Sequence, residues 1–148
     1  MTLLTSAAQR HIPVGGGVTV IAPPSATGGR YSLYRIDLPP LGLGARPHYH
    51  HAFVESFTVL TGTVALLDGD RWVSGQVGDH LVVPELGVHA FRNDTDEPAS
   101  LLMLSTPGAA REDYFDELIE VAGRELTAGQ WSALFARHDQ VMVEDPTL

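Results

Sequence analysis

Short apolar runs separated by turn residues fill residues 14–105 and limit this part of the chain to few folds. Their starts are about 8–12 residues apart, a spacing typical of β-sandwiches and barrels. The expected strands cover residues 18–22, 31–38, 46–51, 55–60, 63–67, 71–73, 80–83, 89–93 and 100–105. Between two of these runs, the pair Asp68-Gly69 predicts a two-residue hairpin. The pattern therefore indicates an all-β body.

Beyond Pro107 the apolar spacing changes to that of helices. In residues 111–122, Tyr114, Phe115 and Leu118 recur at intervals that place them on one helical face. A second short helix is expected after Thr127, which forms a capping box with Gln130. We interpret both helices as packing elements over the β body. We therefore expect one domain over residues 1–148, with a barrel at about 14–106 and a helical C-terminal extension at about 107–148.

Composition excludes several kinds of chemistry. The 148 residues include no cysteine, which removes disulfides, cysteine metal sites and thiol nucleophiles. All nine basic residues are arginines, so Schiff-base chemistry on lysine is also excluded. The net charge of −9 argues against a nucleic-acid partner. No apolar stretch is long enough to predict a membrane span, and the N-terminus does not resemble a signal peptide, so we expect a cytoplasmic protein.

Three histidines and one glutamate form a candidate metal-binding set. His48 and His50 are two residues apart, so on a strand both rings leave the same face. Glu55 follows at the start of the next expected strand, and His89 comes from a distant one. Three imidazoles and a carboxylate suit one divalent transition metal such as Fe, Ni, Mn, Cu or Zn. Four protein ligands leave coordination positions open, as in catalytic sites.

The stretch from Gly42 to Asn93 resembles the two signature motifs of the cupin superfamily. The first motif is G-x5-H-x-H-x3,4-E-x6-G, and its positions are occupied by Gly42, His48, His50, Glu55 and Gly62. The second is G-x5-P-x-G-x2-H-x3-N, which Gly78, Pro84, His89 and Asn93 fit. Leu86 stands where this motif has its second glycine, a departure that concerns the turn before His89.

The resemblance extends to single-domain cupins grouped with quercetin dioxygenase-like proteins. It implies a cupin jelly-roll β-barrel followed by two short C-terminal helices. It also implies a metal held inside the barrel by His48, His50, Glu55 and His89, and a homodimer. The residues themselves indicated only an all-β body, two helices and a plausible ligand set.

Residues separated by an even number of positions on one strand share parity, meaning that their side chains point to the same face. This parity suggests which side chains contact a substrate. Arg46 shares parity with His48, so it either enters the cavity and binds a carboxylate or enolate, or forms a salt bridge at the rim. Phe57 and Val59 share parity with Glu55, and Phe91 shares parity with His89. These three would give the metal an apolar wall or simply fill the barrel core. Of the neighbours Tyr34 and Arg35 only one faces inward, and parity leaves open which.

The remaining histidines and tryptophans are interpreted structurally. His51 is expected at the surface or behind the metal ligands, and His80 as a hydrogen-bonded strand residue. His138 is expected at the surface. Trp72 and Trp131 are interpreted as packing residues.

The sequence favours a metal-dependent enzyme, most specifically a dioxygenase acting on a small hydrophobic or aromatic hydroxy or keto compound, with dioxygen as second reactant. Glu55 would then be both ligand and catalytic base. One alternative is a non-redox isomerase, cyclase or lyase on the same scaffold. Another is a barrel that binds a small molecule without catalysis. The sequence does not distinguish the two enzymes, because both need the same ligands and an apolar pocket.

Overall fold

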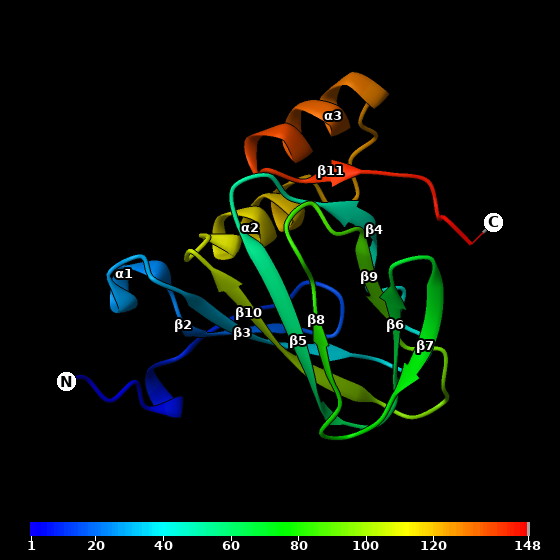
Figure 1. Ribbon diagram of the computed structural model, residues 1–148. Helices are drawn as coiled ribbons and strands as arrows, with labels where there is room; N and C mark the ends of the chain where they lie inside the picture. The colour runs from blue at the N-terminus through cyan, green and yellow to red at the C-terminus, as the bar shows by residue number, and fades with distance from the viewer. Residues whose placement is uncertain (148) are drawn as a thin grey trace.

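A computed structural model describes residues 1–147, which form two facing antiparallel sheets with helices at one end (Figure 1). In one sheet the strand order is β1-β2-β3-β10-β5-β8, and in the other it is β11-β4-β9-β6-β7. The strands are β1 (Arg10–Ile12), β2 (Val18–Ala22), β3 (Ser32–Leu38), β4 (Ala45–Tyr49), β5 (Val54–Thr61), β6 (Val64–Asp68), β7 (Arg71–Gly75), β8 (His80–Val82), β9 (His89–Arg92), β10 (Ala99–Thr106) and β11 (Val141–Met142). The fold is a jelly-roll β-barrel followed by C-terminal helices.

Alternating burial explains how the strands close around a core. Along β3 and β5 every second side chain is buried, as expected for strands with one face on a core. Tyr34, Phe57 and Leu101 are completely buried on the three central strands of the larger sheet. Their inward faces meet Val64, Leu66 and Phe91 from the other sheet. The core therefore lies between the sheets, as in a barrel.

The expected strands are all present, with ends within two residues of the prediction. The hairpin prediction is displaced by one residue: Asp68 pairs with Arg71, so the loop is Gly69-Asp70. Gly69 has a φ of 67°, which a hairpin loop of this kind requires. β1 and β11 were not predicted, because strands of three and two residues are too short to show a period.

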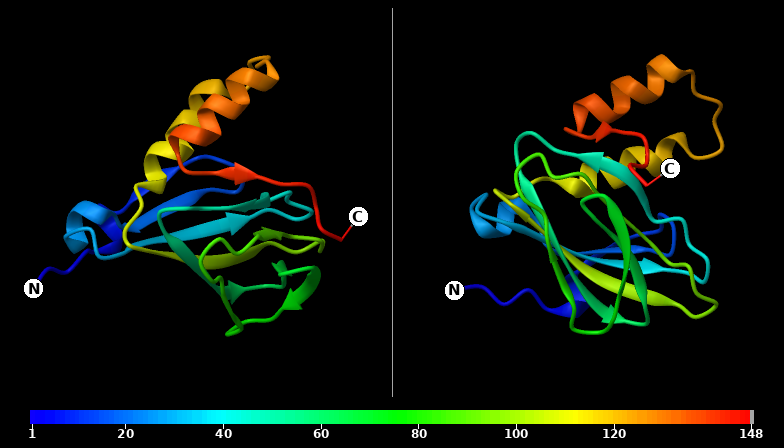
Figure 2. Two further views of the ribbon diagram at one scale, coloured as in Figure 1. Left: turned by 45° about the horizontal axis from the view of Figure 1, so that its top comes forward. Right: turned by 45° about the vertical axis from the view of Figure 1, so that its right-hand side comes forward.

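The helical elements lie at the termini of the barrel. A 3-10 turn, η1 (Ser6–Ala8), and a short helix, α1 (Pro24–Thr27), lie near the N-terminus. The longer helices α2 (Arg111–Val121) and α3 (Ala128–Arg137) both lie at one end of the barrel, with α3 farther from it than α2 (Figure 2). The predicted capping box of Thr127 and Gln130 starts α3. After α3 the chain returns along β4 as β11, so the C-terminal extension closes back onto the barrel.

The turn before His89 places a leucine in a backbone conformation that glycine prefers. Leu86 has a φ of 57°, in the left-handed region that favours glycine, and its side chain is exposed. The Gly87 N–H still donates to the Pro84 carbonyl at 2.9 Å. The departure from the motif at Leu86 therefore places a non-glycine residue in a strained backbone conformation.

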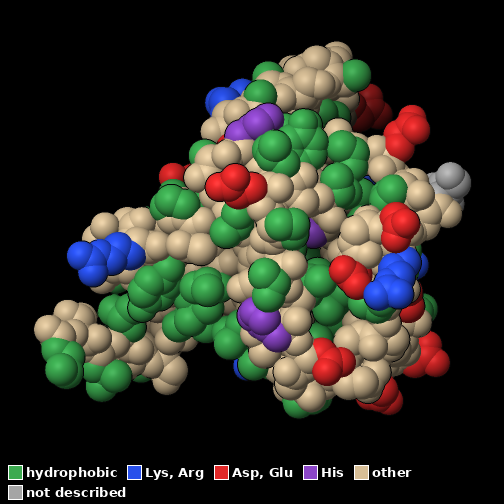
Figure 3. Space-filling model, viewed as in Figure 1, with side chains coloured by type: hydrophobic (Ala, Val, Ile, Leu, Met, Phe, Trp, Pro, Cys, Tyr) green, Lys and Arg blue, Asp and Glu red, His purple; other side chains and the backbone are tan. Residues whose placement is uncertain are grey.

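Within residues 1–147, no helix is long and apolar enough to cross a membrane. Arginine side chains appear as isolated groups on the face shown in Figure 3, so this face carries no basic patch.

Candidate metal centre and its cavity

Three histidines and a glutamate converge inside the barrel. His48 lies on β4, His50 just beyond it, Glu55 on β5 and His89 on β9. One potential ligand atom from each residue lies within 4.8 Å of the other three. The four residues are at most 3% exposed. The fold therefore brings together the set expected from the sequence, although its members lie on both sheets.

Hydrogen bonds fix the same tautomer in all three imidazoles. Nδ1 of His48 lies 2.7 Å from the Arg46 carbonyl oxygen, and Nδ1 of His89 lies 2.9 Å from that of Gly87. Nδ1 of His50 lies 2.6 Å from the Asp139 carbonyl oxygen. A carbonyl only accepts, so each Nδ1 must carry the proton. In the neutral rings, each Nε2 therefore presents a lone pair to the centre of the cluster, where it is able to bind a metal ion.

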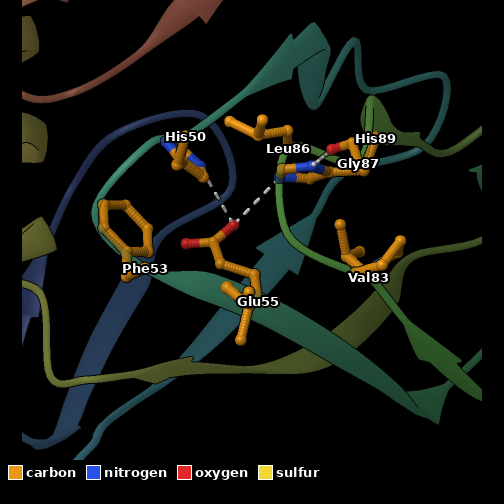
Figure 4. Close-up of a pocket in the computed structure, with 9 residues that line it drawn as sticks. His50, Phe53, Glu55, Val83, Leu86, Gly87 and His89 are labelled. Carbon is orange, nitrogen blue, oxygen red and sulfur yellow. Dashed lines mark hydrogen bonds and ion pairs between the residues drawn. The ribbon is translucent and has the colours of Figure 1, made fainter.

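The two oxygens of Glu55 have different surroundings (Figure 4). Oε2 lies 3.1 Å from Nε2 of His89 and 3.5 Å from Nε2 of His50. Oε1 accepts a hydrogen bond from Ser105 Oγ at 3.1 Å and lies 3.9 Å from Nε of Arg111. Burial alone would raise the pKa of Glu55, but His50, His89 and Arg111 together hold that pKa well below its usual range. The carboxylate is therefore ionised.

Three imidazole Nε2 atoms and a carboxylate oxygen face one another in this cluster. A cation between them, either a proton on an imidazole or a bound metal ion, stabilises the approaches of 3.1 and 3.5 Å between Nε2 and Oε2. Burial and the neighbouring His89 lower the pKa of His48 to about 3, so this imidazole is neutral near pH 7. Within residues 1–147, Nε2 of His50 is one of two buried side-chain polar atoms without a hydrogen-bond partner. The donors therefore fit a divalent transition-metal ion.

A cavity of about 790 Å³ opens beside the cluster, with His48 and Glu55 in its wall. Barrel residues contribute one side of the wall, among them Ile36, Phe91 and Met103. The other side comes from the C-terminal helices, through Tyr114, Phe115, Leu118, Trp131 and Phe135. The interpretation of these helices and of Trp131 as packing alone is therefore incomplete, because both helices help enclose the cavity.

The four residues predicted to contact substrate divide into two pairs. Arg46 and Phe91 lie in the cavity wall. Phe57 and Val59 are buried in the core and are not part of that wall. The Phe57 ring packs against the cluster instead, with its centroid 5.5 Å from that of His89. Parity placed Phe57 on the inward face, but it could not show that Phe57 lies outside the cavity wall.

Tyr34 is the inward member of the pair that parity left open, and Arg35 is exposed. The Tyr34 hydroxyl accepts a hydrogen bond from the Arg111 N–H at 3.0 Å and lies 2.9 Å from the Ala109 carbonyl oxygen. It also contacts the carboxylate of Glu112. Burial and the adjacent Glu112 raise the pKa of Tyr34. Tyr34 thus anchors the start of α2 to the barrel.

Several residues of the centre were not identified from the sequence. The Phe53 ring stacks on His50, with centroids 4.1 Å apart (Figure 4). Arg111 is 5% exposed and lines the cavity beside Glu55. Asp139 binds the His50 ring through its carbonyl, 89 residues away in sequence. No local pattern marks these residues, because each acquires its role through a tertiary contact.

The other histidines lie outside the cluster. His80 is exposed and lies 2.8 Å from Thr58 Oγ1, which agrees with a strand residue hydrogen-bonded to its neighbour. His51 is exposed and lies beside the Asp139 carboxylate. The surface prediction for His138 is wrong: its side chain is 15% exposed, and its Nε2 lies 2.6 Å from Glu117. α2 and α3 pack together at this pair, which covers the ring.

Residues 34–105 match the Cupin domain family. This segment contains all four cluster residues. No curated protein matches the sequence significantly. The match covers slightly less than half of the chain, and the solved structures below share its fold.

Similar solved structures include the polyketide cyclase RemF from Streptomyces resistomycificus, at 18% identity and a TM-score of 0.61, covering 72% of this chain and 80% of that one. A sugar phosphate isomerase of the cupin superfamily from Silicibacter pomeroyi is 24% identical, with a TM-score of 0.59 and coverages of 71% and 75%. A predicted oxalate decarboxylase from Thermotoga maritima is 18% identical, with a TM-score of 0.61 and coverages of 71% and 98%. At these identities the similarity shows the fold alone.

Proposed function

We propose that this cupin-fold chain is a metal-dependent enzyme acting on an apolar hydroxy or keto compound, and within that class a dioxygenase. The ion would be held by His48, His50, Glu55 and His89. One observation carries the proposal: the buried cluster borders a large cavity whose other walls are mainly apolar. A binding site that is mostly apolar with a few polar groups at one place is typical of enzyme pockets.

A divalent ion in this cluster would supply Lewis acidity toward a substrate oxygen, and a redox-active one would also supply dioxygen chemistry. The chain itself contributes orientation and exclusion of water. The Nδ1 hydrogen bonds hold the three rings in place, and Phe53 stacks against one of them. The C-terminal helices cover the cavity, so an apolar substrate would lie against Trp131 and Phe135.

Glu55 is the group that we propose as catalytic base. Its Oε1 is fixed by Ser105, while Oε2 faces the imidazoles. The carboxylate lies in the cavity wall, where it would accept a proton from a substrate hydroxyl. We expect Glu55→Gln to retain much of the bound metal, because the amide keeps one oxygen, but to reduce turnover by about 100-fold or more. Elemental analysis and single-turnover rates measure both, and full turnover by this variant would remove the base role.

Oxygen uptake distinguishes the dioxygenase from the alternatives. The protein, loaded with one metal at a time, is screened with aromatic and alkyl hydroxy and keto compounds while oxygen and products are followed. Stoichiometric oxygen consumption supports the dioxygenase. Conversion at full rate without oxygen contradicts it.

A non-redox reaction at the same centre is the second candidate. The solved structures similar to this chain include a cyclase, an isomerase and a predicted decarboxylase, and none of these descriptions names an oxidation. Anaerobic product formation in the same screen would favour this candidate. Tight binding of a compound that mass spectrometry recovers unchanged would instead favour a barrel without catalysis.

A further inference from the structure

We propose that Arg111 forms an anion-binding subsite in the cavity, so that the ligand carries a carboxylate or an equivalent anionic oxygen at one end of an apolar body. The placement of this subsite beside the reaction centre rests on the proposed function. The subsite itself rests on the surroundings of Arg111.

Arg111 is a buried cation with unused hydrogen-bonding capacity. A guanidinium has five N–H donors. One from Nη1 goes to the His138 carbonyl at 2.9 Å, and one from Nη2 goes to Oε1 of Gln140 at 2.5 Å. Nε has no hydrogen-bond partner, which makes it the second unpartnered buried atom of residues 1–147 besides Nε2 of His50. Leaving charged donors unfilled in a buried site is costly, so the arrangement is suited to an incoming acceptor.

The charge of Arg111 is only loosely balanced. Its nearest carboxylate is Glu55, at 3.9 Å from Nε, beyond hydrogen-bonding distance. That carboxylate is also the one assigned to the metal ion, whose charge would take up the negative charge of Glu55. Tyr114 lies against the guanidinium, with its ring centroid 4.3 Å from Cζ, and contributes no formal charge. A ligand anion would supply the missing negative charge and the missing acceptors.

The cavity is arranged for a ligand with one charged end. Arg111, Gln140, His48 and Glu55 all lie in its wall. Aromatic side chains of α2 and α3 line one side of the remaining wall, and mostly apolar barrel residues line the other. An anionic group held at Arg111 would therefore place an apolar body along these helices and keep it next to the candidate metal centre.

Arg46 is the competing candidate, because it also lies in the cavity wall. Its side chain is exposed, so water already fills its donors and screens its charge. Arg111 is buried, and a charge-assisted hydrogen bond gains more there than at the surface. The two arginines therefore form a natural pair for the test.

Calorimetric titration with 4-phenylbutanoate and its uncharged amide tests the subsite, because the two ligands differ only in charge and hydrogen bonding at one end. The wild type is measured both metal-free and zinc-loaded. We expect the acid to bind about tenfold more tightly than the amide, which corresponds to the loss of one charge-assisted hydrogen bond. In Arg111→Gln the acid should bind about as weakly as the amide, whereas amide affinity should be unchanged. Arg111→Lys should recover part of the preference.

Three outcomes would overturn the inference. One is a wild type that fails to prefer the acid or to bind it measurably, a result that needs no variant. Another is that Arg46→Gln loses the preference for the acid over the amide while Arg111→Gln, shown by circular dichroism to be folded, keeps it. The third is a preference that appears only with zinc and survives Arg111→Gln, since the anion would then be bound by the metal. That last result would leave the proposed function intact, and elemental analysis tests metal binding separately.

Discussion

The imidazoles of the candidate metal centre are held in two different ways. His48 and His89 each donate Nδ1–H to a carbonyl two residues earlier in the chain, those of Arg46 and Gly87. His50 instead donates to Asp139, which follows α3 in the C-terminal extension. The barrel therefore prepares two of its histidines locally, whereas the third depends on the extension being docked.

Glu55 shows the same division. Ser105 of the neighbouring strand β10 binds its Oε1, while the nearest positive charge, Arg111, comes from α2. Ligand atoms thus come from the barrel, and part of their surroundings comes from a segment beyond the matched family region at residues 34–105. The C-terminal extension is therefore part of the site. Substitutions in the barrel and in the C-terminal extension should therefore differ in their effects on metal binding and on stability.

The largest expected effect is loss of a ligand from the barrel. His48→Ala removes one of three nitrogen donors, and we expect binding of nickel or zinc to fall below detection. Equilibrium dialysis with elemental analysis measures it. The matched control is His80→Ala, which removes an exposed imidazole outside the cluster and should bind metal like the wild type. Equal binding by His48→Ala and the control would remove His48 from the centre.

A smaller effect should follow from weakening the extension. The Asp139 carboxylate accepts hydrogen bonds from the His51 and Ala52 N–H groups, the latter at 2.7 Å, and so holds residue 139 against the His50 loop. Without it the His50 ring loses its fixed partner, so Asp139→Ala should lower metal affinity about tenfold. Chelator competition measures the change.

Two control variants separate the causes in this experiment. Asp139 has a φ of 50°, which alanine disfavours, so Asp139→Gly tests the loss of the carboxylate without that strain. Asp139→Asn keeps one acceptor oxygen, so its metal affinity should lie between those of the wild type and Asp139→Gly. Wild-type affinity in Asp139→Gly would show that the extension does not support the centre.

The contact between the two regions should affect stability more than metal binding. Tyr34→Phe removes the hydroxyl that anchors the start of α2, and we expect a loss of about 1 kcal/mol in the free energy of unfolding. Denaturant unfolding measures this loss, and Tyr31→Phe, at an exposed position, is the control. An unchanged midpoint for Tyr34→Phe would mean that the helix is held by its apolar contacts alone.

The smallest effect is expected inside the extension. Hydrogen bonds from Arg137 and His138 lower the pKa of Glu117 below its ordinary value of 4.5. A carboxyl group whose pKa is lowered by folding stabilises the folded state above pH 4.5, the ordinary pKa. This stabilisation is lost as the pH falls through the folded-state pKa. The wild type should therefore melt above Glu117→Gln at about pH 6, and the difference should shrink toward about pH 3. A difference independent of pH would contradict this role.

The sequence by itself determined the strands and the candidate ligands, because both depend on short-range spacing. A separation of two residues puts His48 and His50 on one face of a strand. The alternating pattern of the barrel strands can likewise be recognised from the sequence alone. The motif resemblance supported His89 as the fourth ligand, although it comes from a distant strand. Thr127 and Gln130 predicted the start of α3 for the same reason, since a capping box is local.

Only the tertiary structure decided what surrounds those ligands. Parity gave the inward face of β5 but not the side chains that cover it, and Phe57 packs against His89 rather than lining the cavity. Arg111 and Asp139 reach the centre because the extension folds back along β4. Their roles arise from contacts between residues far apart in the chain, and local sequence patterns do not predict such contacts.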